Sequence, residues 1–317
     1  MTAGAAELRP LQVETNGINV IAEDERKGHP RDLFWPWFAA NVSVLGLSYG
    51  AFVLDFAISF WQALVVGVVG IVLSFLACGF IAVAGKRGSA PTMVLSRAAF
   101  GVNGNKLSAI RGGTVQDLIG ALMFMMTGFG LGWVNCAADY SRYLPRRASS
   151  AGVVGWTTFA SSIAPIFLLI FGLLLAGSSS SLSSAIGADP IGALATLLPT
   201  WFLVPFAIVA VLGLIGGSVL DIYSSGLALL TLGVRIPRYQ AALIDGTVMT
   251  LGTIYVVFVA HNFIGQFEGF LITLGVPIAA WCGIMLADIA LRRRDYAEPE
   301  LFTPAGGTET SGGSPSW

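Results

Sequence analysis

The stretch that decides the fold is Gly128-Phe129-Gly130-Leu131-Gly132-Trp133-Val134-Asn135-Cys136-Ala137-Ala138-Asp139-Tyr140-Ser141-Arg142-Tyr143-Leu144-Pro145-Arg146-Arg147. It places three glycines, a tryptophan and an amide inside an apolar helix, which then ends in acidic, aromatic and basic residues. Because glycine weakens a helix, two interpretations stay open. The helix is discontinuous and its freed backbone groups face a small polar ligand, or the glycines let two helices approach closely.

Composition around this stretch indicates an integral membrane protein. The 317 residues are 55% hydrophobic and 11% charged, with a mean hydropathy of +0.76. No basic stripe interleaved with aromatic residues is present, which argues against a nucleic-acid partner. The cysteines Cys78, Cys136 and Cys282 lack paired spacing and are predicted to pack in apolar surroundings. His29 and His261 are expected on opposite faces, which leaves no histidine metal cluster.

Hydropathy predicts about seven transmembrane helices, since a span needs about 20 apolar residues. The expected spans are residues 34–54, 60–84, 116–138, 152–176, 201–232, 240–260 and 268–291. The run from Trp201 to Gly233 is too long for one straight crossing, so we expect it to be strongly tilted, or broken at Gly216-Gly217. Ser178 to Ser184 is predicted to be a small polar loop, and the tail from Glu298 to be disordered.

The expected organisation follows from these spans. The polar N-terminal segment lacks the features of a signal peptide, so the first span is expected to remain in the mature protein. The predicted parts are a cytoplasmic segment at 1–33, two helices at 34–84, a basic loop and junction at 85–115, five helices at 116–291 and a cytoplasmic tail at 292–317.

Charge places most connections on alternating sides, because Lys and Arg in short loops stay in the cytoplasm. Connections 55–59, 177–200 and 261–267 contain neither residue and are expected outside. Segments 85–113 and 142–147 are both basic, although only one predicted span separates them. One crossing cannot join two loops on the same side. Either an amphipathic piece within 90–110 enters the membrane or an odd number of spans is absent from this chain, and the cost of burying Arg97 and Lys106 favours the second.

Two further groups of polar residues fall inside spans. Asp221 is followed at positions +3 and +4 by Ser224 and Ser225, so the three side chains can share one helical face and present oxygens to a cation or proton. A helix end that reaches interfacial water is the alternative. Asn41 and Ser43 in the first span mark either unwound backbone or a hydrogen bond to a neighbouring helix, and these residues alone favour the hydrogen bond. Structural pairing or solvation is expected for the carboxylates near span ends, Asp55, Asp117, Asp139, Asp245 and Asp288.

Motifs along most of residues 14–300 resemble the nucleobase:cation symporter-1 family, the cytosine/purine permeases and their uracil, allantoin and hydantoin relatives. The matching stretches, in family order, are Glu14-x-Asn16-Gly17-Ile18, Glu25-Arg26-x-Gly28-His29-Pro30, Asp32-Leu33-Phe34-x-x-Trp37-Phe38-Ala39-Ala40-Asn41, Ser59-Phe60-Trp61, Ser96-Arg97-Ala98-Ala99-Phe100-Gly101, Ala138-Asp139-Tyr140-Ser141-Arg142-Tyr143-Leu144-Pro145, Asp221-Ile222-Tyr223-Ser224-Ser225-Gly226 and Met285-Leu286-Ala287-Asp288.

This resemblance implies a leucine-transporter-like fold of inverted repeats and import of a base coupled to sodium or protons. It implies a cation site of the Asn41 and Val44 carbonyls with Asp221, Ser224 and Ser225, and a substrate site that includes Asn41, Phe129, Gly130 and Trp133. At Gly130 the stacking ring of some relatives is missing, so Phe129 or Trp133 would have to substitute.

The chain departs from the family in length. After Gly104-Asn105-Lys106-Leu107 it passes directly into what resembles the sixth helix, so about three internal helices are expected to be absent, together with the last two. The missing third helix carries part of the substrate site in relatives. By this resemblance the first repeat holds two helices of five, and the second repeat, residues 116–291, is complete.

The sequence therefore predicts a multi-pass plasma-membrane permease for a nucleobase-like ring, working by alternating access. No cofactor beyond Na⁺ or H⁺ is expected, and an isolated monomer is expected to show weak or no transport. A membrane protein that binds a base or a partner without transport is the alternative. An intramembrane aspartyl enzyme built on Asp221 with Asp139 or Asp245 lacks a second supporting motif, so no enzyme activity is expected.

Overall fold

The computed structural model of the chain describes residues 16–56, 58–96, 98, 117–234, 236–259, 263–292, 295–296 and 301. These residues form helices and connections without a β-strand, in agreement with the predicted all-α class. Six helices are long and apolar enough to cross a membrane, and a bent pair raises the number to seven. Each predicted span coincides with one of these helices or with the pair. His261 and the tail beyond Leu301 lie outside the described residues.

The first span is a broken helix. After the 3₁₀ turns Glu23–Glu25 and Pro30–Leu33, α1 (Phe34–Asn41) ends, and the chain resumes as a 3₁₀ turn (Val44–Leu47) and α2 (Ser48–Leu54). The two halves meet at an angle of 72°. Ser43 has an extended backbone, and its hydroxyl accepts a hydrogen bond from the backbone N–H of Leu45. Unwound backbone is therefore the correct interpretation of the Asn41–Ser43 pattern.

Two long helices form the centre of the molecule. α3 (Phe60–Gly88) and α8 (Ser150–Ser178) are 29 residues each and pack along one another, and half of the apolar window of each is buried. The short α4 (Thr92–Leu95) follows α3. α8 also packs against both halves of the first span, where a Cβ at Gly172 would lie 2.0 Å from the Leu47 carbonyl oxygen.

The glycine-rich stretch that opens the sequence analysis forms a second broken helix. α6 (Asp117–Gly128) gives way to a 3₁₀ turn (Leu131–Cys136) and then to α7 (Ala137–Ser141). The discontinuous helix is confirmed. The second interpretation, that the glycines let helices approach closely, is confirmed as well. A Cβ at Gly128 would lie 2.4 Å from the Tyr49 ring, and one at Gly130 would lie 2.4 Å from Ser74.

The connection after α8 differs from the prediction. Ser178 is the last residue of α8, and Ser179 caps α9 (Ser180–Ala188) by accepting a hydrogen bond from the Leu182 N–H. The predicted polar loop at 178–184 is therefore wrong, because serine is a good N-cap as well as a loop residue. A third short helix, α10 (Pro190–Thr196), and the 3₁₀ turn Thr200–Phe202 lead into the next span.

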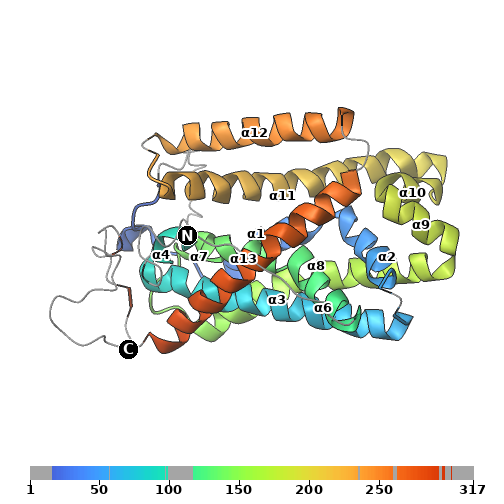
Figure 1. The fold of residues 1–317 in the computed structure, drawn as a ribbon. Helices are drawn as coiled ribbons and strands as arrows, with labels where there is room; N and C mark the ends of the chain where they lie inside the picture. Colours follow the sequence, from blue (N-terminus) through green and yellow to red (C-terminus); the bar gives the residue numbers. More distant parts are fainter. Residues whose placement is uncertain are drawn as a thin grey trace, which may run out of the picture.

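The remaining spans are α11 (Leu203–Thr231), α12 (Arg238–Phe258) and α13 (Phe263–Leu291). α12 lies outermost and packs extensively only on α11 among the described elements, while α13 crosses the bundle diagonally (Figure 1). The predicted break at Gly216-Gly217 is wrong, because α11 is continuous. A Cβ at Gly216 would lie 3.3 Å from the Ala39 carbonyl oxygen, so the glycines permit close approach of α1 instead of a bend.

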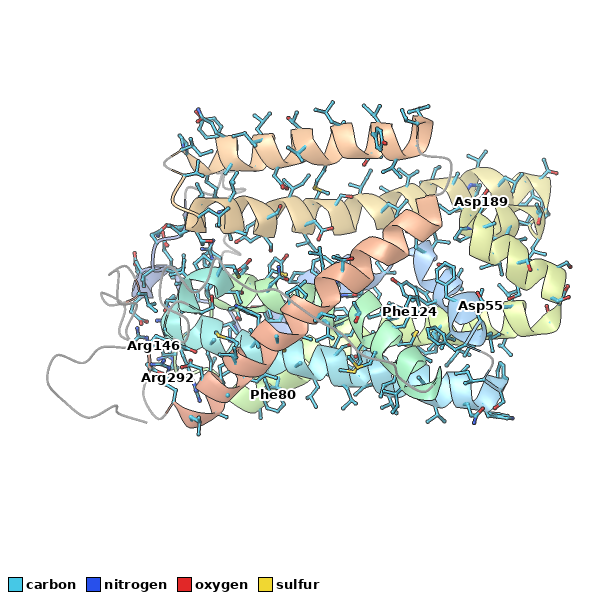
Figure 2. All side chains as sticks on the ribbon, in the orientation of Figure 1. Asp55, Phe80, Phe124, Arg146, Asp189 and Arg292 are labelled. Atoms are coloured by element: carbon cyan, nitrogen blue, oxygen red, sulfur yellow. The ribbon has the colours of Figure 1, made fainter. Side chains whose placement is uncertain are left out.

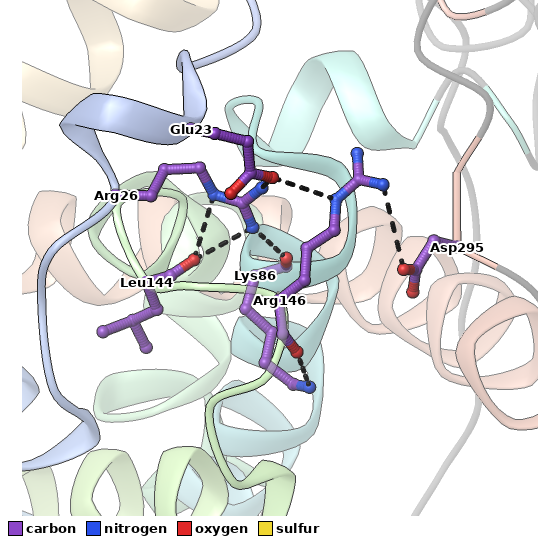
Figure 3. A network of polar contacts seen from close by, with 6 residues as sticks. All are labelled: Glu23, Arg26, Lys86, Leu144, Arg146 and Asp295. Atoms are coloured by element: carbon purple, nitrogen blue, oxygen red, sulfur yellow. Dashed lines mark hydrogen bonds and ion pairs between the residues drawn. The ribbon is translucent and has the colours of Figure 1, made fainter.

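The charged ends of the molecule agree with the charge pattern of the sequence. Arg146 and Arg292 lie at one end of the long helices, and Asp55 and Asp189 at the other (Figure 2). At the basic end, Arg146 is 3.8 Å from Glu23 and 4.0 Å from Asp295 (Figure 3). The N-terminal segment and the segments after α3, α7 and α13 thus gather on one side.

Candidate functional site

A cavity of about 280 Å³ lies where the two broken helices meet α11. Both breaks contribute backbone as well as side chains to its wall. The lining residues are Ala40, Asn41, Ser43, Leu45, Gly46, Ser48, Tyr49, Phe52, Gly128, Phe129, Trp133, Gly213, Leu214, Gly217, Ser218 and Asp221. The cavity is therefore made by segments that are far apart in the sequence and is placed by the helix breaks.

Aromatic side chains form one part of the wall. The Phe129 and Tyr49 ring centroids are 4.4 Å apart, and the Tyr49 hydroxyl donates a hydrogen bond of 3.2 Å to the Gly128 carbonyl oxygen. This bond links α2 to the end of α6. Trp133 also lines the cavity, and its ring centroid is 6.3 Å from that of the fully buried Trp37. These rings offer faces on which a planar ligand can stack.

Oxygen atoms form another part of the cavity wall. The last helical N–H of α1 is that of Val42, which donates to Phe38, so the Ala39, Ala40 and Asn41 carbonyls have no further helical donor. The Asn41 amide donates a 2.9 Å hydrogen bond to the Trp37 carbonyl.

Two side-chain acceptors remain at the cavity. Within the part of the chain that the structure describes, neither the Asn41 side-chain oxygen nor the Asp221 carboxylate receives a hydrogen bond. Both residues line the cavity. Carbonyl and carboxylate oxygens are the ligands that hard cations prefer.

The structure brings four of the eight predicted site residues together and leaves the other four outside the lining. Asn41, Phe129, Trp133 and Asp221 share the cavity. Gly130 faces α3 instead, where its N–H donates to the Ser74 hydroxyl at 3.1 Å and its carbonyl accepts from the Cys78 thiol. Val44 is not among the lining residues.

The two serines after Asp221 have other partners. The Ser224 hydroxyl lies 3.1 Å from the Tyr140 hydroxyl. The Ser225 hydroxyl lies within hydrogen-bond distance of two acceptors, the Asp221 carbonyl oxygen at 2.6 Å and the Asp245 carboxylate of α12. Asp221 of the predicted cluster therefore lines the cavity, whereas Ser224 contacts Tyr140 and Ser225 contacts Asp245.

Sequence reasoning missed Tyr49, Gly213 and Ser218 as cavity residues. A usable signal existed for Tyr49, because a tyrosine inside an apolar span needs a partner for its hydroxyl. Gly213 belongs to the same helical row as Gly216 and Gly217, and a Cβ there would lie 2.7 Å from the Val42 carbonyl oxygen.

Comparisons with known proteins agree with this geometry. The sequence profile of the family described as permease for cytosine/purines, uracil, thiamine, allantoin matches residues 20–116 and 111–308. The putative purine-cytosine permease YxlA of Bacillus subtilis (strain 168) is 20% identical over 383 positions, covering 92% of this chain and 82% of the relative.

The solved structure of Mhp1, a nucleobase-cation-symport-1 family transporter in a closed conformation with bromovinylhydantoin bound, has the same fold. The TM-score is 0.69 at 14% identity, over 93% of this chain and 85% of Mhp1. The expected leucine-transporter-like fold is confirmed.

The chain is shortened relative to these proteins. The alignment with YxlA has 383 positions and includes 92% of this chain, or about 292 residues. About 90 positions of the alignment therefore have no residue of this chain. The two profile matches meet at 111–116, between α4 and α6. Thr92 of α4 contacts Asp139 near the basic end, whereas Gly120 of α6 lies against Phe56 near the other end. That the absent spans are odd in number stays a prediction of the charge pattern.

Proposed function

Because this chain belongs to the family of permeases for cytosine/purines, uracil, thiamine and allantoin, we propose that it is a membrane permease that binds a nucleobase or related small ring at the two helix breaks. The observation that carries the proposal is the cavity itself, where aromatic rings and oxygens without donors converge on one space of about 280 Å³. This volume is near the lower end of the range of about 300–1,000 Å³ for small-molecule sites, which suits a single small ring.

Recognition of the ring follows from the two kinds of wall. The faces of Phe129 and Trp133 stack on the ring, and stacking of a base on an aromatic side chain contributes about 1–3 kcal/mol. The Asn41 side-chain oxygen accepts an N–H of the ring, since no described residue supplies a donor to it. A ring that lacks an N–H on this edge leaves a buried acceptor unpaired and binds more weakly.

Transport is coupled to Na⁺ or H⁺ in this proposal. The Asn41 carbonyl lies at the end of α1, and Asp221 lines the same cavity, so the cation site is shared between the first span and α11. Val44, Ser224 and Ser225 complete the donor set that the resemblance implies. The two serines join only if α11 rotates relative to its position here, because Ser224 and Ser225 now contact Tyr140 and Asp245.

The shortened chain limits transport. Only 6% of the apolar window of α11 and of α12 is buried, against 50% for α3 and α8. Alternating access needs a second body that moves against the bundle, and two loosely packed helices supply part of one. We therefore propose a plasma-membrane protein with a cytoplasmic N-terminus that binds its ring but moves it slowly as an isolated monomer.

The test is uptake of labelled cytosine, uracil, hypoxanthine and allantoin into cells that lack their own carriers for these compounds. We expect slow uptake of one ring that Phe129→Ala abolishes. Fast saturable uptake would contradict the impairment, and loss of all uptake would favour the alternative, a membrane protein that binds without transport. Binding without flux in reconstituted vesicles identifies that alternative, which the low burial of α11 and α12 supports.

A further inference from the structure

Arg142 is a buried cation that the cavity does not use. It follows α7 directly, and none of its surface is exposed. Its guanidinium donates to the Gly17 carbonyl oxygen at 2.8 Å, to the Tyr143 hydroxyl at 3.2 Å and to the Tyr223 hydroxyl at 3.1 Å. Burial of a cation is costly, so a buried arginine that donates to the N-terminal segment, to Tyr143 and to α11 needs an explanation.

Two tyrosines extend this contact between α7 and α11. The Tyr140 and Tyr223 rings stack with centroids 5.6 Å apart and planes inclined by 23°. The Tyr140 hydroxyl donates to the Leu220 carbonyl oxygen at 3.2 Å and also contacts Ser224. Tyr140, Arg142 and Tyr223, called the tyrosine-arginine layer below, therefore join the broken helix to α11.

The layer lies next to one end of the cavity. Along α11 the cavity is lined from Gly213 to Asp221, and the contacts of Tyr140 begin at Leu220 and continue toward the basic end. The Trp37 ring connects the two regions, because its centroid is 6.3 Å from that of Trp133 in the cavity wall and 5.6 Å from that of Tyr140. No described residue of the layer lines the cavity itself.

The N-terminal segment is bound to two parts of the molecule at once. Asn16 accepts a 2.6 Å hydrogen bond from Arg238 of α12, and the same guanidinium lies 4.4 Å from the Tyr223 ring centroid. Farther along, the Ile21 N–H donates to the Ser89 carbonyl oxygen at 2.7 Å.

Arg26 then donates to the Lys86 carbonyl oxygen at 2.7 Å and twice to that of Leu144, at 3.0 and 3.2 Å (Figure 3). Asn16 is thus bonded to α12, whereas Gly17 is bonded to Arg142 after α7 and residues 21–26 are held by the bundle. A movement of α11 and α12 away from the bundle must break the bond between Asn16 and Arg238 and can leave the others intact.

We propose that the tyrosine-arginine layer is the gate that closes the cavity on the side of the N-terminal segment, with Arg142 as its positioning residue and residues 16–17 as its latch. The inference rests on the proposed function, since a permease must open its site to each side in turn. The contacts suit a gate, because each is a single hydrogen bond or ring contact and the equilibrium can shift when one is lost.

The test measures access to the cavity without any transport. Ser218→Cys places a thiol in the cavity wall, and the three native cysteines are buried. A membrane-impermeant maleimide is added to vesicles of each orientation, and Lys27→Cys, at an exposed position, identifies the side that carries the N-terminal segment.

Tyr223→Phe removes the hydroxyl that Arg142 contacts and keeps the ring, and Tyr140→Phe does the same for the bonds to α11. Loss of one hydrogen bond to a charged group corresponds to about a tenfold change in population. We expect labelling from the N-terminal side to become about tenfold faster in Tyr223→Phe and several-fold faster in Tyr140→Phe. Tyr239→Phe is the matched control, because its hydroxyl contacts only Gln240 among the described residues and is exposed.

Unchanged labelling in both variants would overturn the gate, and so would an equal increase in the control. The result is independent of the proposed function, because labelling needs neither a base nor a cation. If the chain binds no base while labelling responds as expected, the proposed function fails and the gate stands. If base binding is present and labelling does not respond, only the gate fails.

Discussion

α8 and α11 have the same mean hydropathy, 2.4, and yet half of the α8 window is buried and only 6% of the α11 window. Hydropathy therefore places both helices in a membrane and says nothing about their neighbours. α8 packs along α1, α2 and α3, whereas α11 touches mainly α12 and the end of α1. The difference shows that the packed bundle carries both helix breaks, whereas α11 and α12 have few described neighbours.

The largest expected effect on stability distinguishes a glycine of α8, in the packed bundle, from a glycine of α12. In Gly172→Ala the new Cβ would lie 2.0 Å from the Leu47 carbonyl oxygen. Because this oxygen belongs to the backbone, the clash is relieved only if α8 and α2 move apart. We expect a loss of about 3 kcal/mol or more, measured as thermal stability in detergent. Gly252→Ala in α12 meets nothing within 4 Å and should change stability by less than about 1 kcal/mol. Equal losses would show that α12 is packed.

A second contrast concerns buried carboxylates. Asp139, 3% exposed, accepts hydrogen bonds from the Thr92 N–H at 2.8 Å and the Thr92 hydroxyl at 3.0 Å. Asp139→Ala leaves a buried N–H without its acceptor, and we expect a loss of about 2 kcal/mol. Asp245→Ala should cost less than about 1 kcal/mol, because Ser225 keeps its bond to the Asp221 carbonyl. Unfolding in a denaturing detergent series measures both, and a larger loss in Asp245→Ala would contradict the contrast.

A third contrast concerns aromatic rings. Trp133→Ala removes a cavity ring and should weaken binding of the transported base by about 1–3 kcal/mol. Phe258→Ala on α12, where the side chain is 78% exposed, should leave binding unchanged. Isothermal titration of the purified variants makes the comparison. Loss of affinity in Phe258→Ala would place part of the binding site on α12.

The smallest expected effect lies in the exposed charges at the basic end. Glu23 is ion-paired with Arg26 and lies 3.8 Å from Arg146, but 72% of its side chain is exposed. Glu23→Gln should lower thermal stability by less than about 1 kcal/mol, because solvent screens such pairs. A loss comparable to that of Asp139→Ala would mean that the N-terminal segment stabilises the bundle through this charge.

Sequence alone located the spans and one of the breaks. The break at Gly128–Gly132 was predictable because three glycines in an apolar helix weaken it locally. The Gly216-Gly217 pair carries the same signal and yet stays helical, since the α1 carbonyls use the space that the glycines leave. Whether a glycine permits a bend or a close approach depends on the neighbouring helix, which the sequence does not place.

The candidate site was predictable in part for a similar reason. Asn41, Phe129, Trp133 and Asp221 were chosen from motifs and do meet at one cavity. Ser224 and Ser225 share a helical face with Asp221 by spacing, but the rotation of that face is set by Tyr140 and Asp245. The shortening of the chain was indicated by charge, because the same-side rule for basic loops needs no structure, and the number of absent helices stays a prediction.

Equilibrium binding of labelled cytosine, uracil, hypoxanthine and allantoin to the purified full chain tests the central claim most directly. If the intact bundle carries the site, at least one ring binds saturably and is displaced by an excess of the same unlabelled ring. Absence of saturable binding for all four rings, in protein whose helical content is verified by circular dichroism, would contradict it.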